Sequence, residues 1–150
     1  MAEINTQLTK ATFNALREAV SNNGWNCIYD EDALTVQYGV KSDDLQLNFY
    51  LLVDPQRQLV LLTCKLPFSF VPHKCVDGAA ETCAINYNLI DGNFAYDFIN
   101  GMCHFKMTCC YRESVISPKA FEFMLNYSVA VLEKYYKRLY HIAIGLESAE

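Results

Sequence analysis

The sequence predicts an α+β fold in which an antiparallel sheet of about five strands is flanked by helices. Residues 34–66 alternate apolar and polar side chains with a period of two, as half-buried strands do. Residues 9–21 and 117–145 instead repeat apolar side chains three and four positions apart, as amphipathic helices do. Asn100-Gly101 separates two further alternating segments, and this dipeptide favours a tight hairpin turn.

The chain is expected to form one domain, residues 1–150, with its elements in the order α-β-β-β-α-β-β-α. We expect a helix at 9–21, a first strand region at 26–40 that an acidic turn at 30–32 interrupts, strands at 45–53 and 59–66, a helix at 74–89, two strands within 93–111 and a helix at 117–145. The sheet should pause between Pro67 and Pro72, because proline donates no hydrogen bond within a strand. Thr9 and Ser117 are the expected caps of the first and last helices.

The turn at Asn100-Gly101 predicts how the second pair of strands is aligned. A two-residue type I′ turn needs positive φ at both central positions, which Asn and Gly accept, and it places Asp97 opposite His104. The side chains of one face are then all apolar: Phe94, Tyr96, Phe98, Cys103, Phe105 and Met107. This face should pack on the core, because a half-buried antiparallel ladder buries only one face.

The first hairpin, with Pro55-Gln56 at the centre of its turn, has one apolar face and one divided face. The apolar face holds Leu47, Phe49, Leu51, Val53, Val60, Leu62 and Cys64. The divided face is polar at Gln46, Asn48, Thr63 and Lys65 and apolar at Tyr50, Leu52, Leu59 and Leu61. Another element of the same chain or a second molecule should cover the last four, since burial of each would contribute roughly 1.5 to 3 kcal/mol. These four residues are the candidate protein-binding patch.

The helix expected at 74–89 combines apolar residues at helical spacing with a run of small ones. The residues at that spacing are Val76, Ala79 or Ala80, Cys83 and Tyr87. The small residues would let a neighbour approach closely, and that neighbour is either the sheet or the same helix of a second subunit. They form the candidate dimer contact: Gly78, Ala79 and Ala80.

Composition narrows the choice of partners. The chain is 19% charged and 52% hydrophobic, so its surface should expose apolar area or meet a partner, which favours an oligomer. A net charge of −5 disfavours nucleic acid, which needs a basic surface. Seven cysteines without scaffold-like spacing indicate free thiols in a reducing compartment, the cytoplasm. No signal peptide or membrane-spanning segment is expected.

No motif indicates chemistry, so we expect no catalytic, cofactor-binding or metal-binding residues. Adjacent Cys103 and His104 point to opposite faces of a strand and cannot form a nucleophile and base pair. His73, Cys75 and Cys83 lack the spacing of zinc ligands. The sequence also has no glycine-rich phosphate loop.

Several short segments carry a resemblance to a known family. They are Leu16-Arg17-Glu18-Ala19 with Gly24-Trp25, Asn86-Tyr87-Asn88-Leu89, Gly92-Asn93-Phe94, Gly101, Ser117-Pro118 and Gly145. In these segments the chain resembles the YbjN-like family, which shares the fold of type III secretion chaperones. The resemblance covers nearly the whole chain, and its residues are structural rather than catalytic.

The resemblance implies a bacterial, non-enzymatic, chaperone-like or regulatory module, usually a cytoplasmic homodimer, that holds a protein segment on its surface. In secretion chaperones the client wraps as an extended chain over hydrophobic patches, which here would be the patch around Tyr50. From the residues themselves we expect no cofactor and no nucleic-acid or membrane partner. The alternative is a small-molecule-binding or enzymatic domain with a site around Asp97 and His104.

Overall fold

The computed structural model describes residues 4–146 and shows six strands and three α-helices. The elements are α1 (Thr6–Asn22), β1 (Cys27–Asp30), β2 (Thr35–Ser42), β3 (Leu45–Asp54), β4 (Leu59–Ser69), a 3-10 turn η1 (Pro72–Lys74), α2 (Cys75–Asn88), β5 (Asn93–Asp97), β6 (Met102–Cys110) and α3 (Pro118–Ala143). The strands form one antiparallel sheet in the order β1-β2-β3-β4-β6-β5. The α+β class and the arrangement of a sheet with flanking helices are confirmed.

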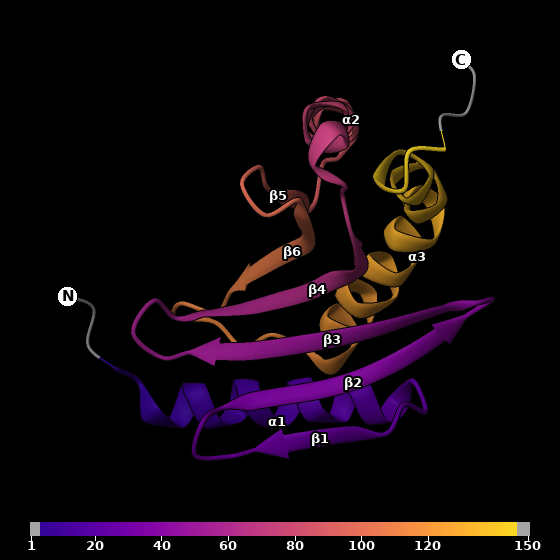
Figure 1. Ribbon diagram of the computed structural model, residues 1–150. Helices are drawn as coiled ribbons and strands as arrows, with labels where there is room; N and C mark the ends of the chain where they lie inside the picture. Colours follow the sequence, from indigo (N-terminus) through magenta and orange to yellow (C-terminus); the bar gives the residue numbers. More distant parts are fainter. Residues whose placement is uncertain (1–3, 147–150) are drawn as a thin grey trace.

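The helices pack on one face of the sheet, and the other face is open. In Figure 1 α1 and α3 lie behind the sheet, and α2 lies at its upper end beside β5. Burial alternates along β3, where Leu47, Phe49 and Leu51 are buried while the side chains between them are not. The period of two that the sequence shows therefore separates a core face from a face that no helix of the described residues covers.

The sheet has one strand more than the sequence indicates. The first strand region, which the acidic turn expected at 30–32 interrupts, is two paired strands, β1 and β2, rather than one element of the order. The side chain of Asp30 accepts hydrogen bonds from the backbone N–H groups of Asp32 and Ala33, which closes that turn locally.

Both predicted registers are wrong by two residues, and the cause is the same. Asp54 and Asp97 each open a four-residue loop by accepting hydrogen bonds from the N–H groups two and three residues ahead. Each loop ends in a left-handed residue, Gln58 (φ 55°) and Gly101 (φ 66°). Asp97 therefore pairs with Met102 rather than His104.

A shift of two residues keeps every strand residue on its predicted face. The apolar faces are as predicted within the strands, because side chains alternate with a period of two. Phe98 is the exception, since it lies in the loop and is 56% exposed rather than packed on the core.

The helix ends follow local capping. Ser117 accepts a hydrogen bond from the N–H of Ala120 and begins α3 where predicted. The first helix begins earlier than predicted, because Asn5 rather than Thr9 caps it by accepting from Leu8. The sheet also does not pause at Pro67: β4 runs to Ser69, with a shift of register that accommodates the proline.

A side chain bonds the outward backbone groups of one residue on the edge strand β5. Asn86, in the last turn of α2, lies beside the edge strand β5. Its Nδ2 donates to the carbonyl oxygen of Phe94 at 2.9 Å, and its Oδ1 accepts from the N–H of Phe94 at 2.8 Å. Asn86 thus takes the place that a further strand would occupy.

Candidate protein-binding surface

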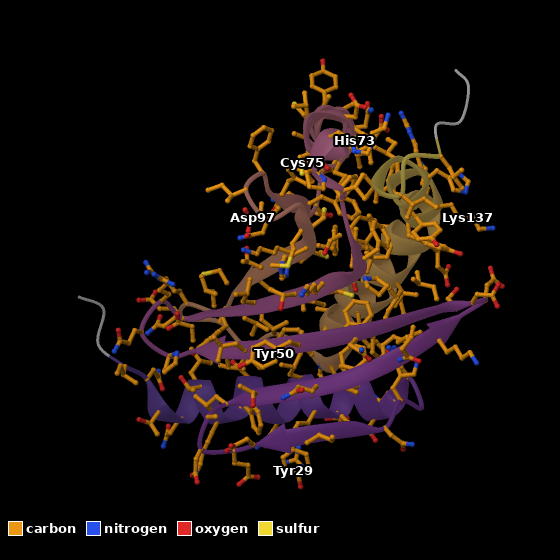
Figure 2. All side chains as sticks on the ribbon, viewed as in Figure 1. Tyr29, Tyr50, His73, Cys75, Asp97 and Lys137 are labelled. Atoms are coloured by element: carbon orange, nitrogen blue, oxygen red, sulfur yellow. The ribbon has the colours of Figure 1, made fainter. Side chains whose placement is uncertain are left out.

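The four residues of the predicted patch lie together on the open face. Leu52 pairs with Leu61 across β3 and β4, and Tyr50 and Leu59 occupy the positions next to this pair. Tyr50 is 40% exposed, and the three leucines are half-buried. Figure 2 shows Tyr50 on the side of the sheet away from α1 and α3. We call Tyr50, Leu52, Leu59 and Leu61 the open-face patch.

Basic side chains border this patch on the same face. Lys65 pairs with His104 and Thr63 pairs with Lys106 across β4 and β6, so the three basic residues are neighbours. We call Lys65, His104 and Lys106 the basic trio. The sequence places each on the polar side of its own strand, but only the pairing of β4 with β6 brings them together.

Helix α2 turns its apolar stripe outward. Its buried residues are Cys75, Gly78, Thr82 and Ile85. Val76 and Tyr87 are 65% and 90% exposed, and Ala80 and Cys83 between them are exposed as well. We call Val76, Ala80, Cys83 and Tyr87 the α2 stripe, and its spacing of four, three and four residues follows one side of a helix.

The small residues of α2 have different surroundings. A Cβ on Gly78 would lie 2.6 Å from Phe70 Cδ1 and 2.7 Å from the hydroxyl of Tyr96, so this glycine packs within its own chain. Ala79 is half-buried and Ala80 is exposed. Of the candidate dimer contact, Ala80 is the member most accessible to a second molecule.

Asp97 and His104 do not form an acid and base pair. The carboxylate of Asp97 accepts from the side chain and backbone of Asn100, which lowers its pKa below the ordinary value. His104 lies opposite Ala95 instead. Asp97 therefore serves its own loop, and no hydrogen bond or ion pair joins it to His104 among residues 4–146.

The thiols of the sheet core are not activated. Burial raises the pKa of Cys103 to about 12, and burial likewise raises the pKa of Cys64 to about 12. A nucleophilic cysteine needs a lowered pKa, since the thiolate is the reactive form. Both residues are side chains of the core.

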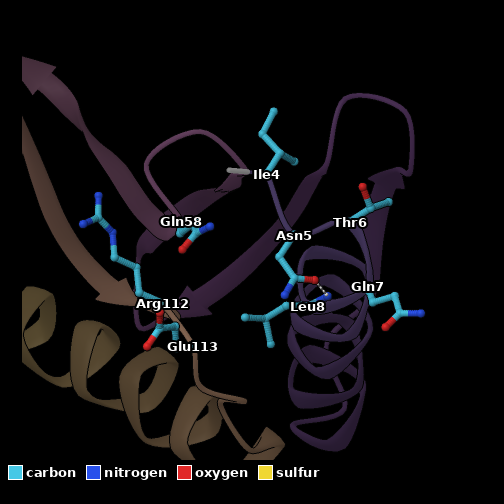
Figure 3. A pocket seen from close by; sticks show the side chains of 8 residues that line it. All are labelled: Ile4, Asn5, Thr6, Gln7, Leu8, Gln58, Arg112 and Glu113. Carbon is cyan, nitrogen blue, oxygen red and sulfur yellow. Dashed lines mark hydrogen bonds between the residues drawn. The ribbon is translucent and has the colours of Figure 1, made fainter. Parts of the chain in front are cut away.

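A cavity of about 780 Å³ lies where α1 begins (Figure 3). Asn5 in its wall is committed to capping α1, and Arg112 donates through Nε to the backbone oxygen of Arg57. Glu113 is the one carboxylate among its lining residues. This polar hollow holds no pairing of a nucleophile or acid with a base.

Residues 4–146 offer neither a metal-binding cluster nor a membrane-spanning helix. No three or more His, Cys, Asp or Glu side chains in this part of the chain lie close enough together to hold a metal ion. None of the helices described is both long and apolar enough to cross a membrane.

Solved structures share this arrangement of helices and strands. No protein-family model matches the chain, and neither does the sequence of any curated protein. The structure of YbjN from E. coli, a proposed transcription regulator, superposes with a TM-score of 0.58 at 11% identity, covering 81% of this chain and 85% of that one. The HopA1-SchA chaperone-effector complex contains a chain that superposes with a TM-score of 0.52 at 15% identity, covering 87% of this chain and 94% of that one.

The chain has the type III secretion chaperone-like fold. This is the fold that the resemblance to the YbjN-like family implies, so that prediction is confirmed. At 11% and 15% identity the likeness concerns the fold, and the role of the open face has to be argued from the residues on it.

Proposed function

We propose that this protein is a non-enzymatic, chaperone-like module that holds an extended segment of another protein on the open-face patch. The observation that carries the proposal is an apolar cluster at the centre of a sheet face that no described helix covers. Apolar side chains exposed together in this way are typical of interaction sites. The chaperone-effector complex of the same fold supports the proposal.

The energy available from the open-face patch is modest. Its four side chains are already partly buried, so covering the rest contributes about half of the roughly 1.5 to 3 kcal/mol expected for each, or about 3 to 6 kcal/mol together. Association costs about 4 kcal/mol or more in lost freedom of motion. A single patch therefore holds its partner weakly, and two patches on one dimer would hold a long partner more firmly.

We propose that the protein is a homodimer whose contact lies on the α2 stripe, including Ala80 of the predicted contact. The stripe has the spacing at which two helices pack side by side, and its small residues allow a close approach. Each copy then leaves its open face accessible, because α2 packs at the end of the sheet (Figure 1). We further propose the cytoplasm as its location, which suits the seven free thiols.

A labelled peptide tests the binding role. The probe is a fluorescein-labelled peptide of 12 residues in which valine alternates with serine and glutamine, and binding is followed by fluorescence anisotropy. Replacing the cross-strand pair, Leu52→Ser with Leu61→Ser, should weaken binding at least tenfold. The matched control, Gln46→Ser with Asn48→Ser, changes the polar end of the same face and should bind as the wild type does. Equal binding by all three folded proteins would refute the proposal.

A further inference from the structure

The basic trio places positive charge on the surface of a protein whose net charge is negative. The chain carries a net charge of −5, yet Lys65 and Lys106 stand as diagonal neighbours on the open face. Neither amine pairs with a carboxylate among residues 4–146. Two acidic residues lie nearby: Asp97 on the neighbouring strand, whose carboxylate is engaged by its own loop, and Asp91, which lines the same hollow as Lys106 without forming an ion pair with it.

The members of the trio act on one another. The pKa of His104 is lowered first by partial burial and then by the charges of Lys106 and Lys65, while Asp97 acts weakly in the opposite sense. A further positive charge is thus disfavoured at this place. A negative charge brought by another molecule would be favoured for the same reason.

The trio lies at a defined distance from the leucines. Leu61 and Lys65 are four residues apart on β4, which corresponds to about 13 Å along a strand. Both side chains project onto the open face, since residues two and four apart on a strand share a face. An extended segment that runs beside β4 covers the same distance with about four of its own residues.

We propose that the segment held on the open face has apolar side chains over the open-face patch and carboxylates, about four residues further along, against the basic trio. This inference rests on the proposed function and adds the chemistry of the partner to it. Two lysine charges beside a leucine cluster, with the imidazole of His104 between them as a hydrogen-bonding group, suit single carboxylates of a peptide, whereas a nucleic acid needs a long basic surface for its phosphates. The occupant is therefore an acidic protein segment.

Two labelled peptides test the charge preference. Both carry the same alternating valines, and one has two glutamates four and six residues after the central valine where the other has glutamines. In 50 mM salt the wild type should bind the glutamate peptide about tenfold more tightly, as expected for two partly exposed ion pairs. In 0.5 M salt the preference should shrink to about twofold or threefold, because screening shortens the reach of exposed charges.

Charge-matched variants locate the preference. Lys65→Gln with Lys106→Gln should bind both peptides equally, with the affinity that the wild type has for the glutamine peptide. Lys10→Gln with Lys119→Gln removes the same charge from exposed positions on α1 and α3 and should keep the tenfold preference. Loss of the preference in this control as well would show an effect of net charge and would overturn the inference.

The two proposals fail differently. If the wild type binds both peptides equally and the leucine variant binds neither, the acidic preference is refuted and the binding role stands. If the wild type binds neither peptide, the proposed function is refuted and the charge preference falls with it.

Discussion

Replacing Gly78 by alanine should destabilise the protein, although alanine is the better helix former. The helix would gain about 1 kcal/mol from the change. The new Cβ would however lie 2.6 Å from Phe70 Cδ1 and 2.7 Å from Tyr96 Oη, and both distances are shorter than those at which a Cβ contacts other atoms in proteins. Phe70 is buried and cannot turn aside without moving the core. The hydroxyl of Tyr96 donates to the backbone oxygen of Cys75 at 2.8 Å, so moving it breaks a hydrogen bond.

Three contributions determine the change in the free energy of unfolding: overpacking, the lost hydrogen bond and the gain in helix propensity. Overpacking costs about 1 to 3 kcal/mol, and the lost hydrogen bond costs about 1 kcal/mol. After the helix gain is subtracted, Gly78→Ala should lower the free energy of unfolding by about 1 to 3 kcal/mol. Urea unfolding followed by circular dichroism measures this, at one fixed protein concentration because association would also stabilise the fold.

A second variant isolates the cause. In a Phe70→Leu background the smaller side chain makes room, so the cost of adding Gly78→Ala should fall by at least 1 kcal/mol. A Gly78→Ala protein more stable than the wild type, or an unchanged cost in the Phe70→Leu background, would refute the packing argument.

Three further predictions follow from loops and surfaces. Asp43 is exposed in the β2–β3 turn and has φ 50°, a conformation that glycine adopts more easily. Asp43→Gly should therefore raise the free energy of unfolding, measured in urea, by about 0.5 kcal/mol. A decrease would show that the aspartate side chain matters more than backbone strain. Because the pKa of Asp97 is lowered in the folded state, its contribution to stability is present above the ordinary pKa of 3.8 and is lost as the pH falls through the folded value. Asp97→Asn should therefore flatten the acid limb of a stability profile between pH 2.5 and 6, and an unchanged limb would contradict this. Tyr87→Glu in the α2 stripe should convert the dimer to a monomer in size-exclusion chromatography with light scattering, while Phe123→Glu, which changes an exposed aromatic residue on α3, should not. A wild type that is monomeric at micromolar concentration would exclude the dimer.

The faces of the strands could be predicted from sequence, whereas their registers could not. Alternation shows which residues share a face whatever the loop length, so Leu52 and Leu61 are correctly placed together. The predicted loop after Asp54 is too short, because a proline directly after the aspartate suggests a two-residue turn. The aspartate that accepts two N–H groups requires four residues instead.

An aspartate also sets the length of the loop at Asn100-Gly101. Only Gly101 takes a positive φ there, because Asp97 organises the residues before it. An aspartate at the end of a strand, followed four residues later by a left-handed residue, would have been the signal for both loops. The same pattern is present at the Asp30 turn, where Leu34 has φ 57°, and it indicates that β1 and β2 are separate strands on either side of that turn.

The candidate surfaces were predictable to different degrees. The open-face patch follows from one hairpin, whose strands are adjacent in sequence. The basic trio depends on β4 pairing with β6, which are separated by α2 and β5, and no local pattern indicates that neighbour. The α2 stripe was visible as a spacing, but Gly78 and Thr82 show that the opposite side of the helix is the buried one.

The hydrogen bonds between Asn86 and Phe94 also affect how copies of this protein can assemble. A fibril grows when each arriving molecule offers a free strand at both margins, one to attach and one to receive the next. Here the amide of Asn86 occupies the backbone groups of Phe94 on one margin, so an arriving strand would have to displace it there, and pairing is easier at the β1 side. Asn86→Ala would reopen that margin, and slow growth of thioflavin-positive aggregates at high concentration would be the result.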